Sequence, residues 1–171
     1  MSAPESHAGA EVSVLFVCLG NICRSPTAEG VFRHRLAQHG LSSRVAVDSC
    51  GTGGYHRGEP PDARARREAR ARGMPIDDLR ARGLTQRDFA RFDYLLAMDR
   101  ANLDTLKRLA PADFTGRIAL LLDFAAEYRG GEIPDPYFGA DDGFGRVFEL
   151  VEAGCAGLIA ELCSRFGWRQ A

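Results

Sequence analysis

The sequence lacks any apolar run long enough to cross a membrane. Its opening residues have neither the charged segment nor the apolar segment of a secretory signal, and its five cysteines do not suggest a disulfide framework in a chain of this size. We therefore expect a cytoplasmic protein with no membrane contact, in a reducing compartment where a reactive thiolate persists. Residues 1–10 are small and polar, and we expect a flexible N-terminal tail there.

The common nucleotide and metal motifs are also missing. The chain has no G-x-x-x-x-G-K-[ST] loop and no G-x-G-x-x-G turn opening a helix, so neither a P-loop nucleotide nor a dinucleotide is indicated. Cys18 and Cys23 are conceivable zinc ligands, but no second cysteine or histidine pair has suitable spacing, and the four histidines are scattered. We expect no metal and no cofactor.

An excess of charge of one sign is absent as well. The net charge is −1, which gives no general reason to expect nucleic acid as a partner. One arginine-rich stretch, Arg64–Arg72 (RARREARAR), departs from this balance. Its ordinary interpretation is a solvated helix face, and docking to an acidic partner is the alternative.

Apolar runs alternate with helical periodicity along the chain, which is typical of an α/β domain. A length of 171 residues fits one domain, which we place at 11–168. Parallel strands need right-handed crossovers, so we expect a four-stranded parallel sheet with helices on both faces. The expected strands are 12–17, 44–48, 92–98 and 117–121, and the expected helices are 26–39, 62–72, 100–109 and 144–166. The last helix is amphipathic and is expected to cover the sheet.

The segment from Cys18 to Pro26 (CLGNICRSP) follows the first expected strand directly. We interpret Ser25 as the N-cap and Pro26 as the first residue of a helix, so the loop N–H groups and the helix dipole converge on an anion. Gly20 and Asn21 are suited to the left-handed backbone conformations that point successive N–H groups inward.

The side chains of this loop indicate phosphoryl transfer. Cys18 is expected to be a nucleophilic thiolate, Arg24 offers two donors to a tetrahedral oxyanion, and Ser25 can donate a hydrogen bond to the thiolate. Together they predict attack on a phosphate ester, where positioning and electrostatic stabilisation dominate. The alternative is a buried cysteine that merely ends a strand.

A leaving oxygen also needs an acid, and the loop contains no carboxylate. Asp135 is the best candidate, because Pro134 and Pro136 on its two sides restrict the backbone and would hold its carboxyl group in place. A plain surface turn is the alternative interpretation of this segment.

The run FVCLGNICRSPTAE, with DPYF late in the chain, closely resembles the low-molecular-weight protein tyrosine phosphatases. VDSCGTGGY, FDYLLAMDRANL and DPYFGADDGF extend the resemblance from about Val12 to the final helix. The resemblance implies a phosphotyrosine phosphatase I-like fold. It also implies hydrolysis of phosphotyrosine and small aryl phosphates through a phosphocysteine intermediate.

The resemblance also implies residue roles. Cys18 is similar to the nucleophile, Arg24 to the residue that clamps the phosphoryl group, and Asp135 to the general acid and base. Asn21 matches the residue that holds the strained loop, and Cys23 one that forms a reversible disulfide with the nucleophile. The phosphate-binding loop so implied comprises Leu19, Gly20, Asn21, Ile22, Cys23 and Ser25. The substrate cleft walls are Tyr55, Tyr137 and Phe138, Ile22 matches a further wall position, and Leu19 lies at the mouth.

Three positions depart from the family pattern. Phe138 stands where many members have a second tyrosine, Cys50 where many have alanine, and His56 at a variable place near the cleft rim. We expect only a packing effect from Cys50.

Alternatives within and beyond the family remain. A thioredoxin-coupled arsenate reductase needs further central cysteines, and none lies between Cys50 and Cys155. Protein-arginine phosphatases commonly have threonine at Ile22, where a branched apolar residue better suits an aromatic ester. A non-catalytic phosphotyrosine-binding module is the remaining alternative, although it would be expected to lose a catalytic residue. The implied partner is a phosphotyrosine protein, for example a bacterial tyrosine kinase.

Overall fold

The computed structural model describes residues 9–139 and 142–170, so the expected tail lies almost entirely outside the described residues. A single sheet organises the molecule, with every strand pair parallel and the order β2-β1-β3-β4. Its strands are β1 (Val12–Cys18), β2 (Val45–Gly51), β3 (Tyr94–Ala97) and β4 (Arg117–Leu120). The predicted four-stranded parallel sheet is confirmed.

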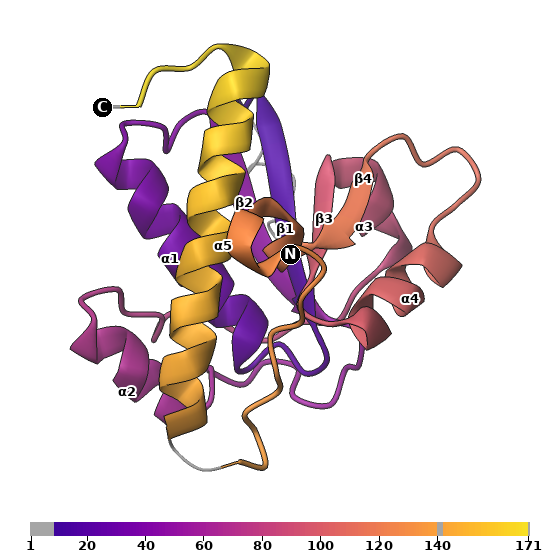
Figure 1. Ribbon diagram of the computed structural model, residues 1–171. Coiled ribbons are helices and arrows are strands. Elements are labelled where there is room, and N and C mark those ends of the chain that lie inside the picture. The colour runs from indigo at the N-terminus through magenta and orange to yellow at the C-terminus, as the bar shows by residue number, and fades with distance from the viewer. Residues whose placement is uncertain (1–8, 140–141, 171) are drawn as a thin grey trace.

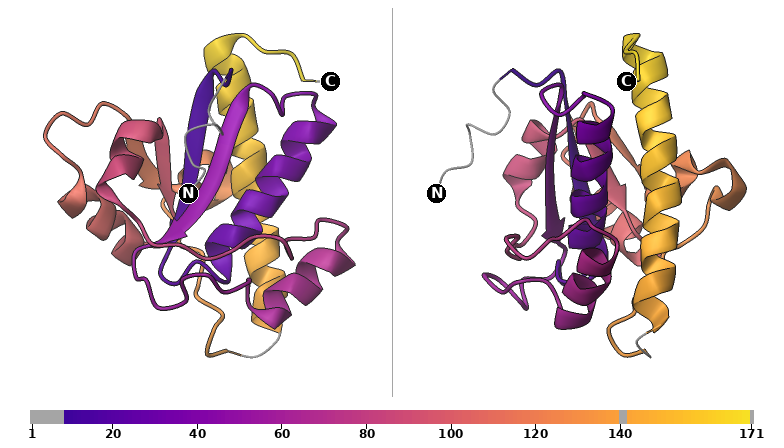
Figure 2. Two further views of the ribbon diagram at one scale, coloured as in Figure 1. Left: turned by 180° about the vertical axis from the view of Figure 1, so that it is seen from behind. Right: turned by 90° about the vertical axis from the view of Figure 1, so that its left-hand side faces the viewer.

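Helices cover both faces of this sheet, as expected (Figure 1; Figure 2). Helices α1 (Arg24–Gln38) and α5 (Asp142–Phe166) lie on one face, and α3 (Gln86–Arg91) and α4 (Arg100–Leu109) lie on the other. Helix α2 (Ala63–Ala71) packs against α5.

Strand β1 is buried along its whole length because alternate side chains enter two separate cores. Val14 and Phe16 join the core under α1 and α5. Leu15 and Val17 join the core that includes Leu106 of α4. The strand that ends at Cys18 is therefore held from both sides, and it presents its last residue at a fixed place.

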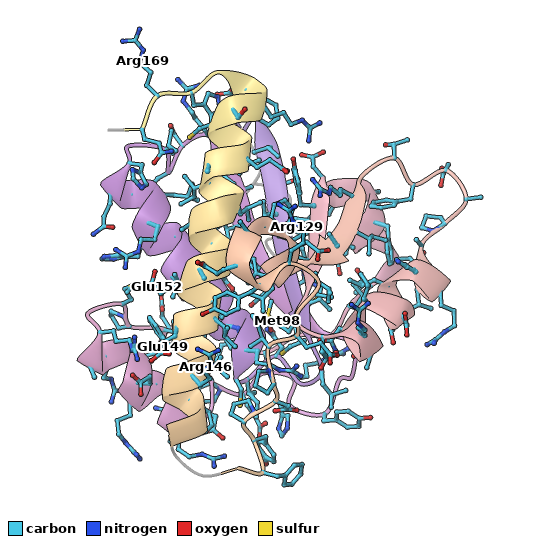
Figure 3. All side chains as sticks on the ribbon, in the orientation of Figure 1. Met98, Arg129, Arg146, Glu149, Glu152 and Arg169 are labelled. Carbon is cyan, nitrogen blue, oxygen red and sulfur yellow. The ribbon has the colours of Figure 1, made fainter. Side chains whose placement is uncertain are left out.

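Helix α5 approaches a 3₁₀ helix, η2 (Leu121–Phe124), very closely, and η3 (Ala126–Tyr128) follows η2. A Cβ atom at Gly157 would lie 1.7 Å from the carbonyl oxygen of Phe124, so only glycine fits there. On α1, Arg35 pairs with Glu152 of α5 at 2.6 Å, and Glu152 follows Glu149 and Arg146 along α5 (Figure 3).

The start of α1 differs from the prediction. The helix begins at Arg24, so Ser25 is not its N-cap, and Pro26 lies two residues inside. The Ser25 hydroxyl is instead engaged with the side chains of Cys18 and Asn21. Pro26 is tolerated because the first four N–H groups of a helix have no partner within it.

Other boundaries shift by a few residues, and α3 and the two 3₁₀ helices were not predicted. The strands expected at 44–48 and 92–98 run instead from Val45 to Gly51 and from Tyr94 to Ala97. Asp62 is the N-cap of α2, where its carboxylate accepts from the Arg64 N–H at 2.8 Å. Helix α3 is short and starts after Thr85 in a capping box.

The arginine-rich stretch forms α2 and the residue that follows it. Arg72 pairs with Glu68 at 2.6 Å, and Arg70 pairs with Asp77. Arg70 is largely exposed, which fits the solvated helix face that was the ordinary interpretation. Over the described part of the chain, no helix is long and apolar enough to span the membrane.

Candidate active site

The loop after β1 curls around the thiol of Cys18. The backbone N–H of Asn21 donates to Cys18 Sγ at 3.2 Å, and Ser25 Oγ lies 3.0 Å from the same sulfur. Asn21 has φ +58°, the left-handed conformation expected for it, whereas Gly20 does not adopt a positive φ. The strain is therefore carried by an asparagine, one of the residue types that tolerates it.

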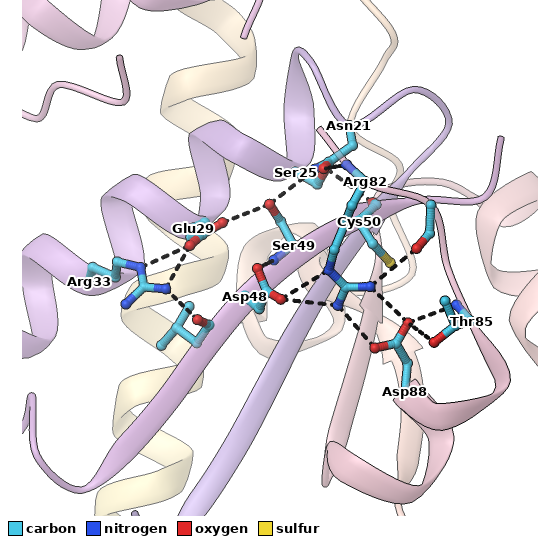
Figure 4. A network of polar contacts seen from close by, with 12 residues as sticks. Asn21, Ser25, Glu29, Arg33, Asp48, Ser49, Cys50, Arg82, Thr85 and Asp88 are labelled. Carbon is cyan, nitrogen blue, oxygen red and sulfur yellow. Dashed lines mark hydrogen bonds and ion pairs between the residues drawn. The ribbon is translucent and has the colours of Figure 1, made fainter. Parts of the chain in front are cut away.

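The Asn21 side chain ties the loop to the structure behind it (Figure 4). Its Nδ2 donates to Ser25 Oγ at 2.8 Å and to Ser49 Oγ at 3.0 Å, while its Oδ1 accepts from the backbone N–H of Arg82 at 3.0 Å. Asn21 and Ser25 are both buried beneath the loop, and neither lines the cleft in front of it.

Arg24 is the largest of the fully buried side chains, at 2 % exposure. Its Nη1 donates to Asp99 Oδ2 at 2.6 Å and to the Ile133 carbonyl at 3.0 Å. Its Nη2 lies 3.6 Å from Asp135 Oδ2. Burial alone lowers the pKa of Arg24, but Cys18 and Asp99 outweigh it and raise the pKa above its ordinary value. The guanidinium therefore keeps its positive charge beside Cys18.

Asp135 reaches the cleft from the loop before α5. Its Oδ1 accepts from the Tyr137 backbone N–H at 3.1 Å, which orients the carboxylate, and its side chain is 39 % exposed. The carboxyl group is thus held toward Arg24 while it remains open to solvent and to a substrate oxygen.

The predicted walls surround one cleft of about 180 Å³. Tyr137 contacts Phe138 edge to face with ring centroids 4.8 Å apart, and its ring centroid lies 6.0 Å from that of His56. Tyr55 and Phe138 are highly exposed, at 76 % and 94 %. The lining residues are Cys18, Leu19, Gly20, Ile22, Cys23, Arg24, Tyr55, His56, Asp135, Tyr137 and Phe138.

The two cysteines near Cys18 are in different environments. Burial raises the pKa of the Cys23 thiol strongly, and Asp62 raises it further. Burial likewise raises the pKa of Cys50 well above its usual range, despite the nearby Arg82. Both are therefore poor nucleophiles at neutral pH.

Sequence reasoning missed two polar residues of the site and underused a third. Asp99 and Ser49 were not singled out, and His56 was placed only near the rim, although it lines the cleft. Asp99 lies two residues after the end of β3. Ligands bind at the carboxyl ends of parallel strands, so its position in the sequence could have marked it as a site residue. Ser49 carried no such signal, because it lies within a buried strand.

No group of three or more His, Cys, Asp and Glu side chains among the described residues could hold a metal ion. The Arg24 guanidinium and the Asp135 carboxylate line the same cleft as the Cys18 thiol, and they lie 3.6 Å apart.

Comparisons with known proteins agree with this geometry. Residues 13–166 match the model of the family described as low molecular weight phosphotyrosine protein phosphatase. The low molecular weight protein-tyrosine-phosphatase YfkJ of Bacillus subtilis is 40 % identical over 151 residues, which cover 88 % of this chain and 96 % of that protein.

Solved structures show the same fold. A protein tyrosine phosphatase from Entamoeba histolytica, with Hepes in its active site, superposes with a TM-score of 0.85 at 38 % identity, covering 91 % of this chain and 99 % of the other. A Drosophila arginine phosphatase has a TM-score of 0.82 at 31 % identity, covering 87 % and 96 %. On the family match and these relatives, the chain belongs to the low molecular weight protein-tyrosine-phosphatase family.

Proposed function

We propose that this protein hydrolyses phosphotyrosine and small aryl phosphate monoesters through a phosphocysteine intermediate on Cys18. The observation that carries the proposal is the convergence of Cys18, Arg24 and Asp135 on one aromatic-walled cleft. The domain that performs this reaction is residues 11–168. At its two ends, Trp168 Nε1 donates to Glu11 Oε1 at 3.3 Å, which joins the segment after α5 to the residue just before β1.

In the first step, the Cys18 thiolate attacks phosphorus, an S–P bond forms, and the bond from phosphorus to the phenolic oxygen breaks. Nη1 of Arg24 is engaged by Asp99 and Ile133, so its remaining donors serve the phosphoryl oxygens. The carboxylic acid form of Asp135 gives its proton to the leaving phenolate oxygen.

In the second step, the Asp135 carboxylate takes a proton from water, and that water attacks phosphorus. The S–P bond breaks, inorganic phosphate leaves, and Cys18 returns as a thiolate. The Ser25 hydroxyl, 3.0 Å from Cys18 Sγ, stabilises the sulfur as a leaving group.

The cleft favours an aromatic ester. Tyr55, Tyr137 and Ile22 line it, and a phosphotyrosine ring reaches past them to the loop whereas a short phosphoserine does not. A protein-arginine phosphatase is the second candidate, because a Drosophila arginine phosphatase shares the fold. The apolar Ile22 beside the phosphate favours the tyrosine ester.

The substrate is a phosphotyrosine protein in the cytoplasm, with a tyrosine kinase as one candidate. All five cysteines are free, which suits a reducing compartment. Cys18 and Cys23 both line the cleft, and a disulfide between them would protect the nucleophile from overoxidation.

The test is hydrolysis of para-nitrophenyl phosphate and of matched phosphotyrosine and phosphoarginine peptides. We expect turnover without added metal, unaffected by chelator, inhibited by vanadate and abolished in Cys18→Ser, with Cys163→Ser as a control that keeps activity. Asp135→Ala should slow ester cleavage by about 10²–10⁴-fold, most for poor leaving groups. Turnover by Cys18→Ser, or preference for phosphoarginine, would overturn the proposal.

A further inference from the structure

A buried carboxylate on α1 is connected to the reactive thiol by hydrogen bonds alone. Figure 4 shows this chain from Glu29 through Ser49 and Asn21 to Ser25. Glu29 is 3 % exposed, and its Oε1 accepts from Ser49 Oγ at 2.7 Å. Ser49 Oγ in turn accepts from Asn21 Nδ2, which also donates to Ser25 Oγ. Glu29 is five residues from Arg24 along the chain but lies behind the loop, outside the cleft.

One charged residue holds Glu29 in place. Arg33 donates from Nε and Nη2 to Glu29 Oε2 at 2.9 and 2.7 Å, and it also donates to the Val47 carbonyl. Its guanidinium thus occupies one carboxylate oxygen fully, and the other oxygen faces Ser49. Asp48 is the other charged group that acts on Glu29.

The carboxylate of Glu29 and the backbone N–H of Arg82 together set the direction of the protons in this chain. An ionised carboxylate only accepts, so the single Ser49 proton is committed to Glu29, and Ser49 Oγ is left as an acceptor for Asn21. Asn21 Oδ1 already accepts from Arg82, so both Nδ2 protons donate, one to Ser49 and one to Ser25. Ser25 Oγ then uses its own proton as a donor.

Two acceptors lie within reach of that proton. Cys18 Sγ lies 3.0 Å from Ser25 Oγ, and the Cys50 carbonyl lies 3.3 Å away. A thiolate accepts more strongly than a neutral carbonyl and is closer here. We propose that Glu29 is a positioning residue for Cys18. By accepting the Ser49 proton it makes Ser49 Oγ an acceptor for Asn21, and this contact, with the Arg82 N–H, holds the Asn21 amide in the orientation that directs the Ser25 hydroxyl at the sulfur.

The proposal rests on the proposed function, and it predicts a particular kinetic signature. In Glu29→Gln, the single amide oxygen has to face the two donors of Arg33, so its NH₂ faces Ser49 and leaves the Ser49 proton without an acceptor. The Asn21 amide then keeps the Arg82 contact but loses Ser49 as its second anchor. The Ser25 donor is therefore held less firmly on the sulfur, both as attacking thiolate and as leaving group, while the cleft walls that bind the substrate are untouched.

We therefore expect Glu29→Gln to hydrolyse the phosphocysteine intermediate about tenfold more slowly in single-turnover assays, with KM changed less than about twofold. A tenfold change equals about 1.4 kcal/mol, within the range of one hydrogen bond to a charged group. Alkylation of Cys18 by iodoacetamide at neutral pH should slow similarly. The matched control is Glu152→Gln. Glu152 lies on α5 and pairs with Arg35, which is on α1 like Glu29, and its replacement should leave both rates unchanged.

The decisive comparison uses the Ser25→Ala background. If Glu29 acts through Ser25, Glu29→Gln adds no further loss there, and Ser49→Ala behaves in the same way, which keeps the test available should Glu29→Gln fold poorly. Equal losses with and without Ser25, or no loss in either single variant, would overturn the proposal. The alkylation rate is independent of turnover, so it tests this relay even if the protein proves to act on another ester.

Discussion

Nη1 of Arg24 donates to Oδ2 of Asp99 across 2.6 Å, joining the first turn of α1 to the N-cap of α4. Asp99 also accepts from the Asn102 N–H through its other oxygen, at 2.8 Å. The Asp99 carboxylate therefore forms an ion pair with Arg24 and also caps α4, and the two contacts fix its position. Because Arg24 is buried, its guanidinium has little freedom beyond the direction that Asp99 sets.

Asp99→Asn should keep the helix cap, since asparagine caps as well as aspartate, but weaken the hold on Arg24. We expect kcat for para-nitrophenyl phosphate to fall between about tenfold and a hundredfold, because a misplaced group close to the reaction is costly. Vanadate affinity should fall with it. Asp104→Asn, an exposed site on the same helix, is the control. Unchanged kcat in Asp99→Asn would show that Arg24 is held by other contacts.

The environment of Cys23 predicts selective chemistry in the phosphate-binding loop. Burial, with Asp62, raises the pKa of Cys23, so this thiol stays protonated at neutral pH. Iodoacetamide under native conditions should modify Cys18 and leave Cys23 intact, as read by peptide mass spectrometry. Vanadate in the site should protect Cys18. Alkylation of Cys23 as fast as Cys18 in the folded protein would contradict the expected difference.

Gly157 makes a sharp test of how α5 packs. A methyl group there would lie 1.7 Å from the Phe124 carbonyl oxygen, so the backbone of α5 or of η2 would have to move. We expect Gly157→Ala to lower the free energy of unfolding by at least about 3 kcal/mol in urea denaturation. Ala156→Gly, at the exposed neighbouring position, should cost only about 1 kcal/mol. A neutral Gly157→Ala would mean that α5 shifts easily.

The sheet, its parallel topology and the placement of the Cys18 loop could be predicted because each rests on local pattern. β1 and the run of residues after it carry strong signals, and the strand-end rule then locates the site. Asp135 was a candidate because two flanking prolines restrict its backbone, and the family resemblance then favoured the acid role over a plain surface turn. The wall positions Tyr55 and Tyr137 came from the family resemblance instead.

What the sequence did not reveal depends on partners distant along the chain. The local sequence around Ser25 is typical of an N-cap, but its hydroxyl forms hydrogen bonds with the Cys18 sulfur and the Asn21 side chain instead. Glu29 resembles an ordinary polar position on α1, and only the approach of Ser49 from β2 makes it part of the site. Helix α3 is too short for its periodicity to register, although its capping box was a usable signal.

Glu29 also predicts a pH dependence of stability with a definite sign. Burial, outweighing Arg33 and Ser49, raises the pKa of Glu29 above its ordinary value of 4.5. Below that value both folded and unfolded chains are protonated at this site. As pH rises above it, the unfolded chain ionises first, so the folded state binds more protons and stability from this residue is lost.

Subtracting Glu29→Gln from the parent isolates this contribution, because the other titrating groups cancel. We expect the difference in unfolding free energy, parent minus variant, to fall as pH rises above about 4.5. It should level off once the folded-state carboxyl of Glu29 has ionised. A difference that rises with pH would mean that Arg33 and Ser49 outweigh burial. The levelling point also marks the pH above which Glu29 is the carboxylate that the Ser49 contact requires.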